Sequence, residues 1–282
     1  MGRKAAWTEK RIKEKHQRGD GQGELASYKP WLTVSEVASN GRSRRPWSWK
    51  TGRKHELFSD VEHDLFLLCE WSRSVVDIWE QYPLQRDMTQ TIANQLGIRH
   101  PAYVGTHVPT VMTVDFLLTV SGAEGERFVA LNAKRTEEAE DETSLEKLEV
   151  QRTYFAELGI QHHLIYHSRI SERKVNNIFY VRTAQLGENE VEKPYPGYFD
   201  ELKGRMSSQL HSAAPNLTLA EYCSGFDADV GSVPGTGLRV AKMLMQERAL
   251  AVDLDSPDLS KEPMSSFLMT SRPGQLRAIG GK

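Results

Sequence analysis

The amino-acid sequence predicts an α/β fold built on a mixed sheet, and the order of its elements is the main reason. Residues 57–169 change between helical and extended patterns in the order helix, strand, helix, hairpin, helix, strand. The two strands within residues 111–136 are joined by the short, Gly-containing turn SGAEGE, which is typical of a β-hairpin. That order indicates a mixed sheet flanked by helices, and 282 residues suffice for one large domain or two smaller ones.

Local signals mark the elements before the hairpin. Ser59 is a good N-cap, and the apolar residues after it share one helical face: Val61, Leu65, Leu68 and Cys69. The segment VVDIWEQYP (75–83) alternates as a strand and ends at a proline. A second helix is predicted over 87–97, because Gly97 is a typical stop.

The elements after the hairpin fall into two groups. Residues 140–159 carry acids early and a glycine at the end, which predicts a helix, and HHLIYH (162–167) is a short apolar strand. Beyond residue 169 come a predicted helix (171–181), a polar Pro-rich connector, two helical segments and the short apolar MSSFLM. Helix, turn, helix and then a strand is the order of a winged-helix unit.

Charge divides the chain further. Residues 1–55 contain 14 Lys and Arg against five Asp and Glu, a net charge of +9, whereas the rest of the chain carries −11. We therefore predict a basic, partly flexible arm over 1–55, a catalytic α/β domain over 56–169 and a winged-helix-like domain over 170–282. The acidic balance beyond the arm argues against DNA binding by the C-terminal domain.

The basic arm has the composition of a nucleic-acid contact. The stretch GRSRRPWSWKTGRKH combines cations that bind phosphates with rings that stack on bases. The predicted DNA-contacting residues are Arg42, Arg44, Arg45, Trp47, Trp49, Lys50, Arg53 and Lys54. The alternative is a solvated, disordered leader without a ligand.

Nothing in the sequence predicts a membrane or an oxidising compartment. No apolar run approaches the roughly 20 residues of a membrane span, and the N-terminus lacks the apolar segment of a signal peptide. The only cysteines, Cys69 and Cys223, lie in apolar contexts and are expected to be buried, reduced thiols. We expect a cytoplasmic protein that joins the nucleoid when it binds DNA.

The hairpin carries the residues with catalytic potential. Asp115 interrupts an apolar strand, and an unpaired buried acid is costly enough to suggest a purpose. Asn132 and Lys134 lie two apart on the second strand and so share a face, while the Ala133 carbonyl is a possible extra ligand. An acid, an oxygen ligand and a lysine are the groups that Mg²⁺-dependent phosphodiester hydrolysis needs, although Asn132 stands where a second acid would be familiar.

Two further acids are candidates with clear alternatives. Glu62 could be a third metal ligand, but Ser59-x-x-Glu62 is also a capping box, in which the glutamate reaches back to the Ser59 backbone N–H. Glu146 and Glu149 lie three apart on the helix after the hairpin, so one of them could face the site. Their alternative is an ordinary solvated helix face.

Several motifs resemble the TnsA endonuclease subunit of heteromeric, cut-and-paste bacterial transposases. They are SDVEHDLF, DIWEQYPL, TVDF, LNAK and LEKLEVQRTYFAELGI, and the resemblance covers about residues 40–170. It implies a restriction-endonuclease-like (PD-(D/E)XK) core that cuts DNA at the 5′ ends of the transposon. It also implies metal ligands at Glu62, Asp115 and Glu149, with Lys134 as a catalytic residue. The family has Gln two residues before that lysine, and Asn132 is the shorter amide.

The resemblance also implies a cofactor and partners. The cofactor is Mg²⁺, for which Mn²⁺ is expected to substitute, and the partners are DNA, a TnsB-type DDE transposase and a TnsC-type AAA+ ATPase. We expect the C-terminal domain mainly to bind the ATPase. Two alternatives stay open: a stand-alone resolvase or restriction-type nuclease of the same fold, and a non-catalytic DNA-binding assembly factor, which Asn132 makes worth considering.

Overall fold

A computed structural model describes residues 6–37, 42–135, 142–187 and 190–270. The chain divides into two compact units, Met1–Ile170 and Ser171–Lys282, and each is described by itself.

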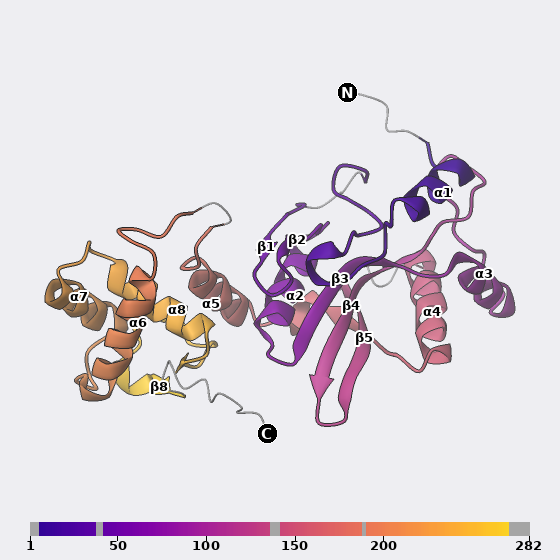
Figure 1. The fold of residues 1–282 in the computed structure, drawn as a ribbon. Helices are drawn as coiled ribbons and strands as arrows, with labels where there is room; N and C mark the ends of the chain where they lie inside the picture. The colour runs from indigo at the N-terminus through magenta and orange to yellow at the C-terminus, as the bar shows by residue number, and fades with distance from the viewer. Residues whose placement is uncertain (1–5, 38–41, 136–141, 188–189, 271–282) are drawn as a thin grey trace, which may run out of the picture. The chain divides into compact units, whose positions relative to one another are not determined.

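A four-stranded mixed sheet forms the centre of the first unit (Figure 1). Its order is β3 (Val75–Pro83), β4 (Thr113–Gly122), β5 (Gly125–Lys134) and β6 (Gln161–Tyr166). β4 runs antiparallel to both β3 and β5, and β6 runs parallel to β5. A hairpin needs only a short turn, whereas the parallel step needs a crossover, which α4 supplies. The predicted α/β fold with a mixed sheet is confirmed.

Three helices pack on this sheet: α2 (Asp60–Trp71), α3 (Arg86–Gln95) and α4 (Glu142–Glu157). The last two share one apolar cluster with the sheet, made of Leu84, Ile92, Ala93, Met112, Val114, Leu117, Ala130, Val150, Tyr154 and Phe155. α2 packs separately, against β3 and β5. Gly97 follows α3 with φ +69°, a left-handed conformation in which glycine is favoured, as expected for a helix stop.

The N-terminal segment packs on the free edge of β3. It contains α1 (Glu9–Gln17) and the short strands β1 (Trp47–Ser48) and β2 (Arg53–Lys54). Donors from this segment bond four β3 carbonyls: Lys50 Nζ to Val75, Arg53 Nη2 to Ile78 (2.6 Å), the Tyr28 hydroxyl to Glu80 (3.0 Å) and the Trp31 N–H to Gln81 (3.3 Å). These bonds seal an edge that would otherwise expose unpaired carbonyls. The described part of the predicted arm is therefore part of the first unit.

Buried charges fix the same contact. The Arg53 guanidinium makes two bonds to the Glu80 carboxylate, at 2.8 and 2.6 Å, and His55 Nδ1 lies 2.7 Å from Glu80 Oε2. Glu80 and His55 are fully buried, and Arg53 is 7% exposed. A buried charge needs such partners, so these residues hold the segment to the sheet.

The second unit is mainly helical. Its elements are α5 (Glu172–Arg182), α6 (Tyr198–Gln209), α7 (Leu219–Val230), α8 (Thr236–Gln246) and an antiparallel pair, β7 (Leu250–Ala251) with β8 (Leu268–Met269). The Asp227 carboxylate accepts the N–H groups of Gly235 (2.7 Å) and Gly237 (2.6 Å), which fills the positive start of α8 with the chain's own anion. Helices followed by two-residue strands do not establish a winged helix, which stays a prediction.

Two sequence expectations can be checked against these boundaries. Cys69 and Cys223 are buried free thiols, as predicted. The expectation of an acidic C-terminal domain is wrong: residues 171–282 contain 13 Lys and Arg against 14 Asp and Glu, whereas residues 56–170 contain nine against 19. The excess of negative charge therefore belongs to residues 56–170, and the basic residues 1–55 nearly balance it within the first unit. Among the described residues, no helix is long and apolar enough to span a membrane.

Candidate active site

The hairpin strands separate at the end that carries the candidate catalytic residues. Backbone pairing between β4 and β5 stops at Phe116 and Leu131. Beyond it, side chains take over: the Asp115 N–H donates to Asn132 Oδ1 at 3.1 Å, and the Ala133 N–H donates to Asp115 Oδ2 at 2.8 Å. The fork therefore fixes the position of Asp115 from both strands.

The Asn132 side chain is fixed by several hydrogen bonds. Its side-chain nitrogen donates to Gln151 Oε1 at 2.5 Å and to His162 Nε2 at 3.1 Å, and the residue is 3% exposed. Gln151 in turn donates to the Thr113 carbonyl at 2.7 Å, which ties α4 to the start of β4. Burial, with the neighbouring His163 and Arg152, lowers the pKa of His162 to about 4, so its neutral ring can accept a bond. These bonds give Asn132 a positioning role, and direct contact with a metal through the second lone pair of Oδ1 stays a prediction.

Glu62 caps the helix that carries it and also faces the fork. The Ser59 hydroxyl accepts the Glu62 N–H at 3.1 Å, and the Glu62 carboxylate accepts bonds from the Ser59 hydroxyl (3.0 Å) and the Phe58 N–H (2.9 Å). The capping box is therefore modified, because the glutamate reaches the Phe58 N–H and not that of Ser59. Capping does not exclude a metal, since each carboxylate oxygen has a second lone pair.

The pKa shifts indicate that the three predicted catalytic residues influence one another. Burial, and then the charge of Asp115, raises the pKa of Glu62 to about 8, while Lys134 opposes this shift. Burial also raises the pKa of Asp115, against the Ala133 N–H and Lys134. Such mutual influence requires that Glu62, Asp115 and Lys134 lie close together, although they come from three different elements.

The donor set fits a hard divalent cation. Two carboxylates that repel each other and share one lysine lack a balancing positive charge, which Mg²⁺ would supply. Among the described residues, no three His, Cys, Asp or Glu side chains are grouped as a metal site. The Ala133 carbonyl could serve as a neutral third ligand. Mg²⁺ tolerates this because it keeps several waters.

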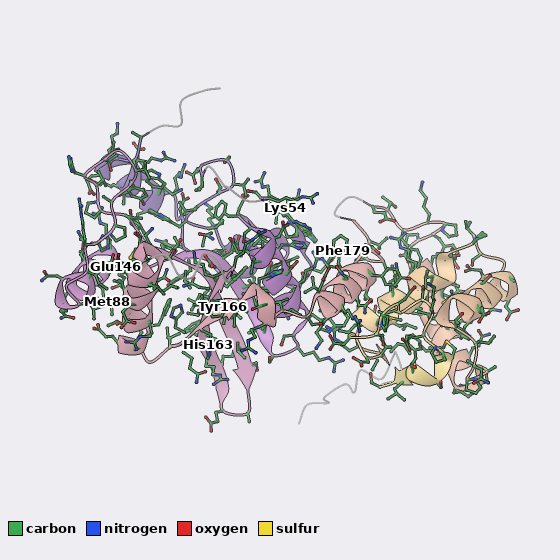
Figure 2. All side chains as sticks on the ribbon, turned by 180° about the vertical axis from the view of Figure 1, so that it is seen from behind. Lys54, Met88, Glu146, His163, Tyr166 and Phe179 are labelled. Carbon is green, nitrogen blue, oxygen red and sulfur yellow. The ribbon has the colours of Figure 1, made fainter. Side chains whose placement is uncertain are left out.

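The two candidate acids on α4 have other neighbours in this structure, and metal binding by Glu149 stays a prediction. Glu149 bonds Arg152 at 2.6 and 2.8 Å, and its side chain is 41% exposed. It lies two residues from Gln151, about 200° away around a helix, and so points away from Asn132. Glu146 lines a hollow beside the loop 98–106 (Figure 2 labels it on α4). The residue of α4 that reaches the fork is Gln151, which the sequence analysis missed.

Most of the predicted DNA-contacting cations have protein partners. Arg44 pairs with Asp60 at 2.7 Å and Arg45 with Glu56 at 2.6 Å, while Lys50 and Arg53 bond β3 carbonyls. Arg53 is buried, so the prediction that it contacts DNA is wrong for this conformation. Arg42, Trp49 and Lys54 remain exposed, and Trp47 is half-buried (Lys54 is labelled in Figure 2).

The fold, with Asp115 and Lys134 at the hairpin fork and Glu62 facing it, indicates an endonuclease domain. Comparison with known proteins supports this class. Residues 72–167 match the family model described as TnsA-like endonuclease N terminal, which includes the fork but begins after Glu62. The Transposon Tn7 transposition protein TnsA of Escherichia coli is 39% identical over 188 residues, covering 67% of this chain and 68% of that protein. The chain belongs to the TnsA family.

Proposed function

We propose that this protein is the Mg²⁺-dependent endonuclease subunit of a transposase and cuts DNA at the 5′ ends of the transposon. The convergence of Glu62, Asp115 and Lys134 on a forked hairpin carries the proposal, because it supplies acids and a cation at one place. Family membership supports the link with transposition. No feature of the described residues favours a stand-alone nuclease or a non-catalytic factor.

Each residue at the site has a distinct role in this proposal. Glu62 and Asp115 would hold the metal, with the Ala133 carbonyl as a neutral ligand, and a bound Mg²⁺ would polarise the phosphoryl oxygen and lower the pKa of water. Lys134 offsets negative charge on the scissile phosphate. Asn132 and Gln151 bridge the separated ends of the two strands and orient Asp115. Glu149, expected from the resemblance to lie near metal, would need to leave Arg152 to do so.

We further propose that the chain works with a TnsB-type transposase and a TnsC-type AAA+ ATPase, the latter through residues 171–282. Exposed apolar side chains of the second unit, Val233 (75% exposed) and Leu268 (66%), offer contact points for a protein partner. Val233→Asp and Leu268→Asp should each weaken ATPase binding by the full chain. Unchanged binding by the double variant argues against these two contact points.

Strand-specific mapping of cuts at transposon ends tests the main proposal. In a reaction reconstituted with both partners, the wild-type chain should cut the 5′ ends with Mg²⁺ or Mn²⁺ and stop on addition of EDTA. Asp115→Ala should abolish these cuts and leave 3′-end cleavage intact. Persistent 5′ cuts by Asp115→Ala, or cuts in EDTA, would exclude the assigned site.

A further inference from the structure

A hollow of about 380 Å³, lined by both apolar and polar side chains, lies between the loop 98–106 and the first half of α4. Arg99, His100, Thr143, Glu146 and Lys147 line it, among other residues. The loop wall is braced by backbone bonds from the Tyr103 N–H to the Val108 carbonyl (3.0 Å) and from the Thr110 N–H to the Pro101 carbonyl (2.9 Å). A hollow with such a wall keeps its shape before a ligand binds, which lowers the entropic cost of binding.

One helix connects this hollow to the active site. Lys147 precedes Gln151 by four residues, so the two share a side of α4, with Cβ atoms about 5–6 Å apart. Gln151 bonds Asn132 and the Thr113 carbonyl, at the end of the sheet that also carries Asp115 and Lys134. A DNA strand whose phosphate reaches the fork would therefore place its next phosphates toward Lys147.

The charges in the hollow suit a phosphate. Arg99 and Lys147 are exposed and make no ion pair within the described residues, and residues 56–170 contain only nine Lys and Arg in all. His100 bonds Thr89 and the Pro101 carbonyl, and burial lowers its pKa, so it adds no charge at neutral pH. Among the described lining residues, Glu146 is the acid that opposes this attraction.

We propose that this hollow binds a backbone phosphate of the DNA strand next to the scissile one, through Arg99 and Lys147. Arginine grips phosphate oxygens with two parallel N–H bonds, and lysine adds a point charge. The Thr143 hydroxyl is a further donor. This assignment rests on the proposed endonuclease function and places a DNA contact outside the stretch 42–54.

Salt-dependent DNA binding tests the assignment. The full chain carrying Asp115→Ala, which prevents cleavage, is titrated with a 30-base-pair duplex by fluorescence anisotropy at several salt concentrations. Adding Arg99→Gln and Lys147→Gln should weaken binding about tenfold and reduce the slope of log affinity against log salt by about 1, since one phosphate contact contributes about 0.9. Glu146→Gln should strengthen binding, because it removes the opposing charge.

Arg127→Gln is the matched control, because Arg127 is an exposed cation beside the turn of the hairpin, at the end opposite the fork. Its salt slope should equal that of the parent chain. An unchanged slope in the double variant, or an equal loss in Arg127→Gln, overturns the assignment while the endonuclease function stands. If neither the parent chain binds DNA nor the wild type cuts with its partners present, both the function and this inference fail.

Discussion

Two buried glutamates of the first unit, Glu62 and Glu80, show opposite electrostatics. Glu80 is fully buried, yet Arg53 and His55 outweigh the cost of burial and lower its pKa to about 2. Glu62 is 7% exposed, and burial together with Asp115 raises its pKa to about 8. Burial disfavours both anions, so their neighbours decide the difference.

The Glu80 carboxylate stabilises the fold, whereas Glu62 has the charge environment of a metal ligand. Arg53 supplies a permanent cation to Glu80, and burial lowers the pKa of His55, so that ring is neutral at pH 7. Glu62 has a second acid as its neighbour, and the bonds from the Phe58 N–H and the Ser59 hydroxyl, together with a shared lysine, do not offset the rise in its pKa. An incomplete charge balance is typical of a site that completes itself with a metal ion.

Glu221 in the second unit shows that the local sequence motif does not decide whether a capping glutamate has a raised or a lowered pKa. Thr218-x-x-Glu221 is the same capping motif as Ser59-x-x-Glu62, and the Thr218 N–H donates to Glu221 Oε2 at 2.9 Å. Glu221 is exposed, and bonds from Thr218 lower its pKa. One motif therefore gives a plain cap in one unit and a candidate ligand in the other.

The largest expected effect is the loss of cleavage in Glu62→Gln. We expect 5′-end cutting to fall by at least about 10³-fold, since a metal ligand supplies several kcal/mol to the transition state. The melting temperature should change little, because the amide oxygen still accepts the Phe58 N–H and the amide nitrogen can donate to the Ser59 hydroxyl. Glu221→Gln, the matched cap, should cut normally, and cleavage measured per folded protein compares the two. Normal cutting by Glu62→Gln would reduce Glu62 to a cap.

Glu80→Gln should act on stability alone. Removing one partner of a buried ion pair costs about 3–5 kcal/mol, because Arg53 stays buried without its counter-charge. Urea unfolding of the variant measures this loss, and cutting per folded molecule should match the wild type. A specific cleavage defect in well-folded Glu80→Gln would blur the distinction between the two glutamates.

Acid should destabilise the first unit through the same cluster. A carboxyl group with a folded pKa of about 2 stabilises the protein above its unfolded value of 4.5, and this contribution is lost as pH falls from 4.5 through 2. The loss is on the order of 3 kcal/mol. The lowered pKa of His55 acts in the same direction, starting below pH 6.5. Urea titrations from pH 7 to 3 should show this slope, and Glu80→Gln should flatten it below pH 4.5.

The smallest expected effects distinguish the residues of α4. Gln151→Ala should slow cleavage about tenfold and cost about 1–3 kcal/mol, because Asn132 and the Thr113 carbonyl lose buried partners. Gln151→Glu, which keeps an acceptor for Asn132, should recover part of the rate. Glu149→Gln should cut normally. If Glu149→Gln abolishes cutting and Gln151→Ala does not, Glu149 must leave Arg152 and join the metal site.

The sequence by itself determined the local features of this protein. The periodicity of residues 75–83, the turn after β4 and the caps at Ser59 and Gly97 depend on neighbours within a few positions, so they are readable in one dimension. The spacing of Asn132 and Lys134 on a hairpin with Asp115 could be predicted for the same reason. The winged-helix order of the second unit rested on element order alone, which leaves three-dimensional packing open.

Only the tertiary structure decided which charged and polar residues meet. Arg53 was assigned to DNA from its basic surroundings, but Glu80, 27 positions later, binds it. Gln151 looked like any polar helix residue until α4 brought it against Asn132. The capping motif of Glu62 gave no sign that burial and Asp115, 53 positions away, would raise the pKa of its carboxyl group. Burial and long-range charge act through space, so a linear pattern predicts which groups are available but not which of them become partners.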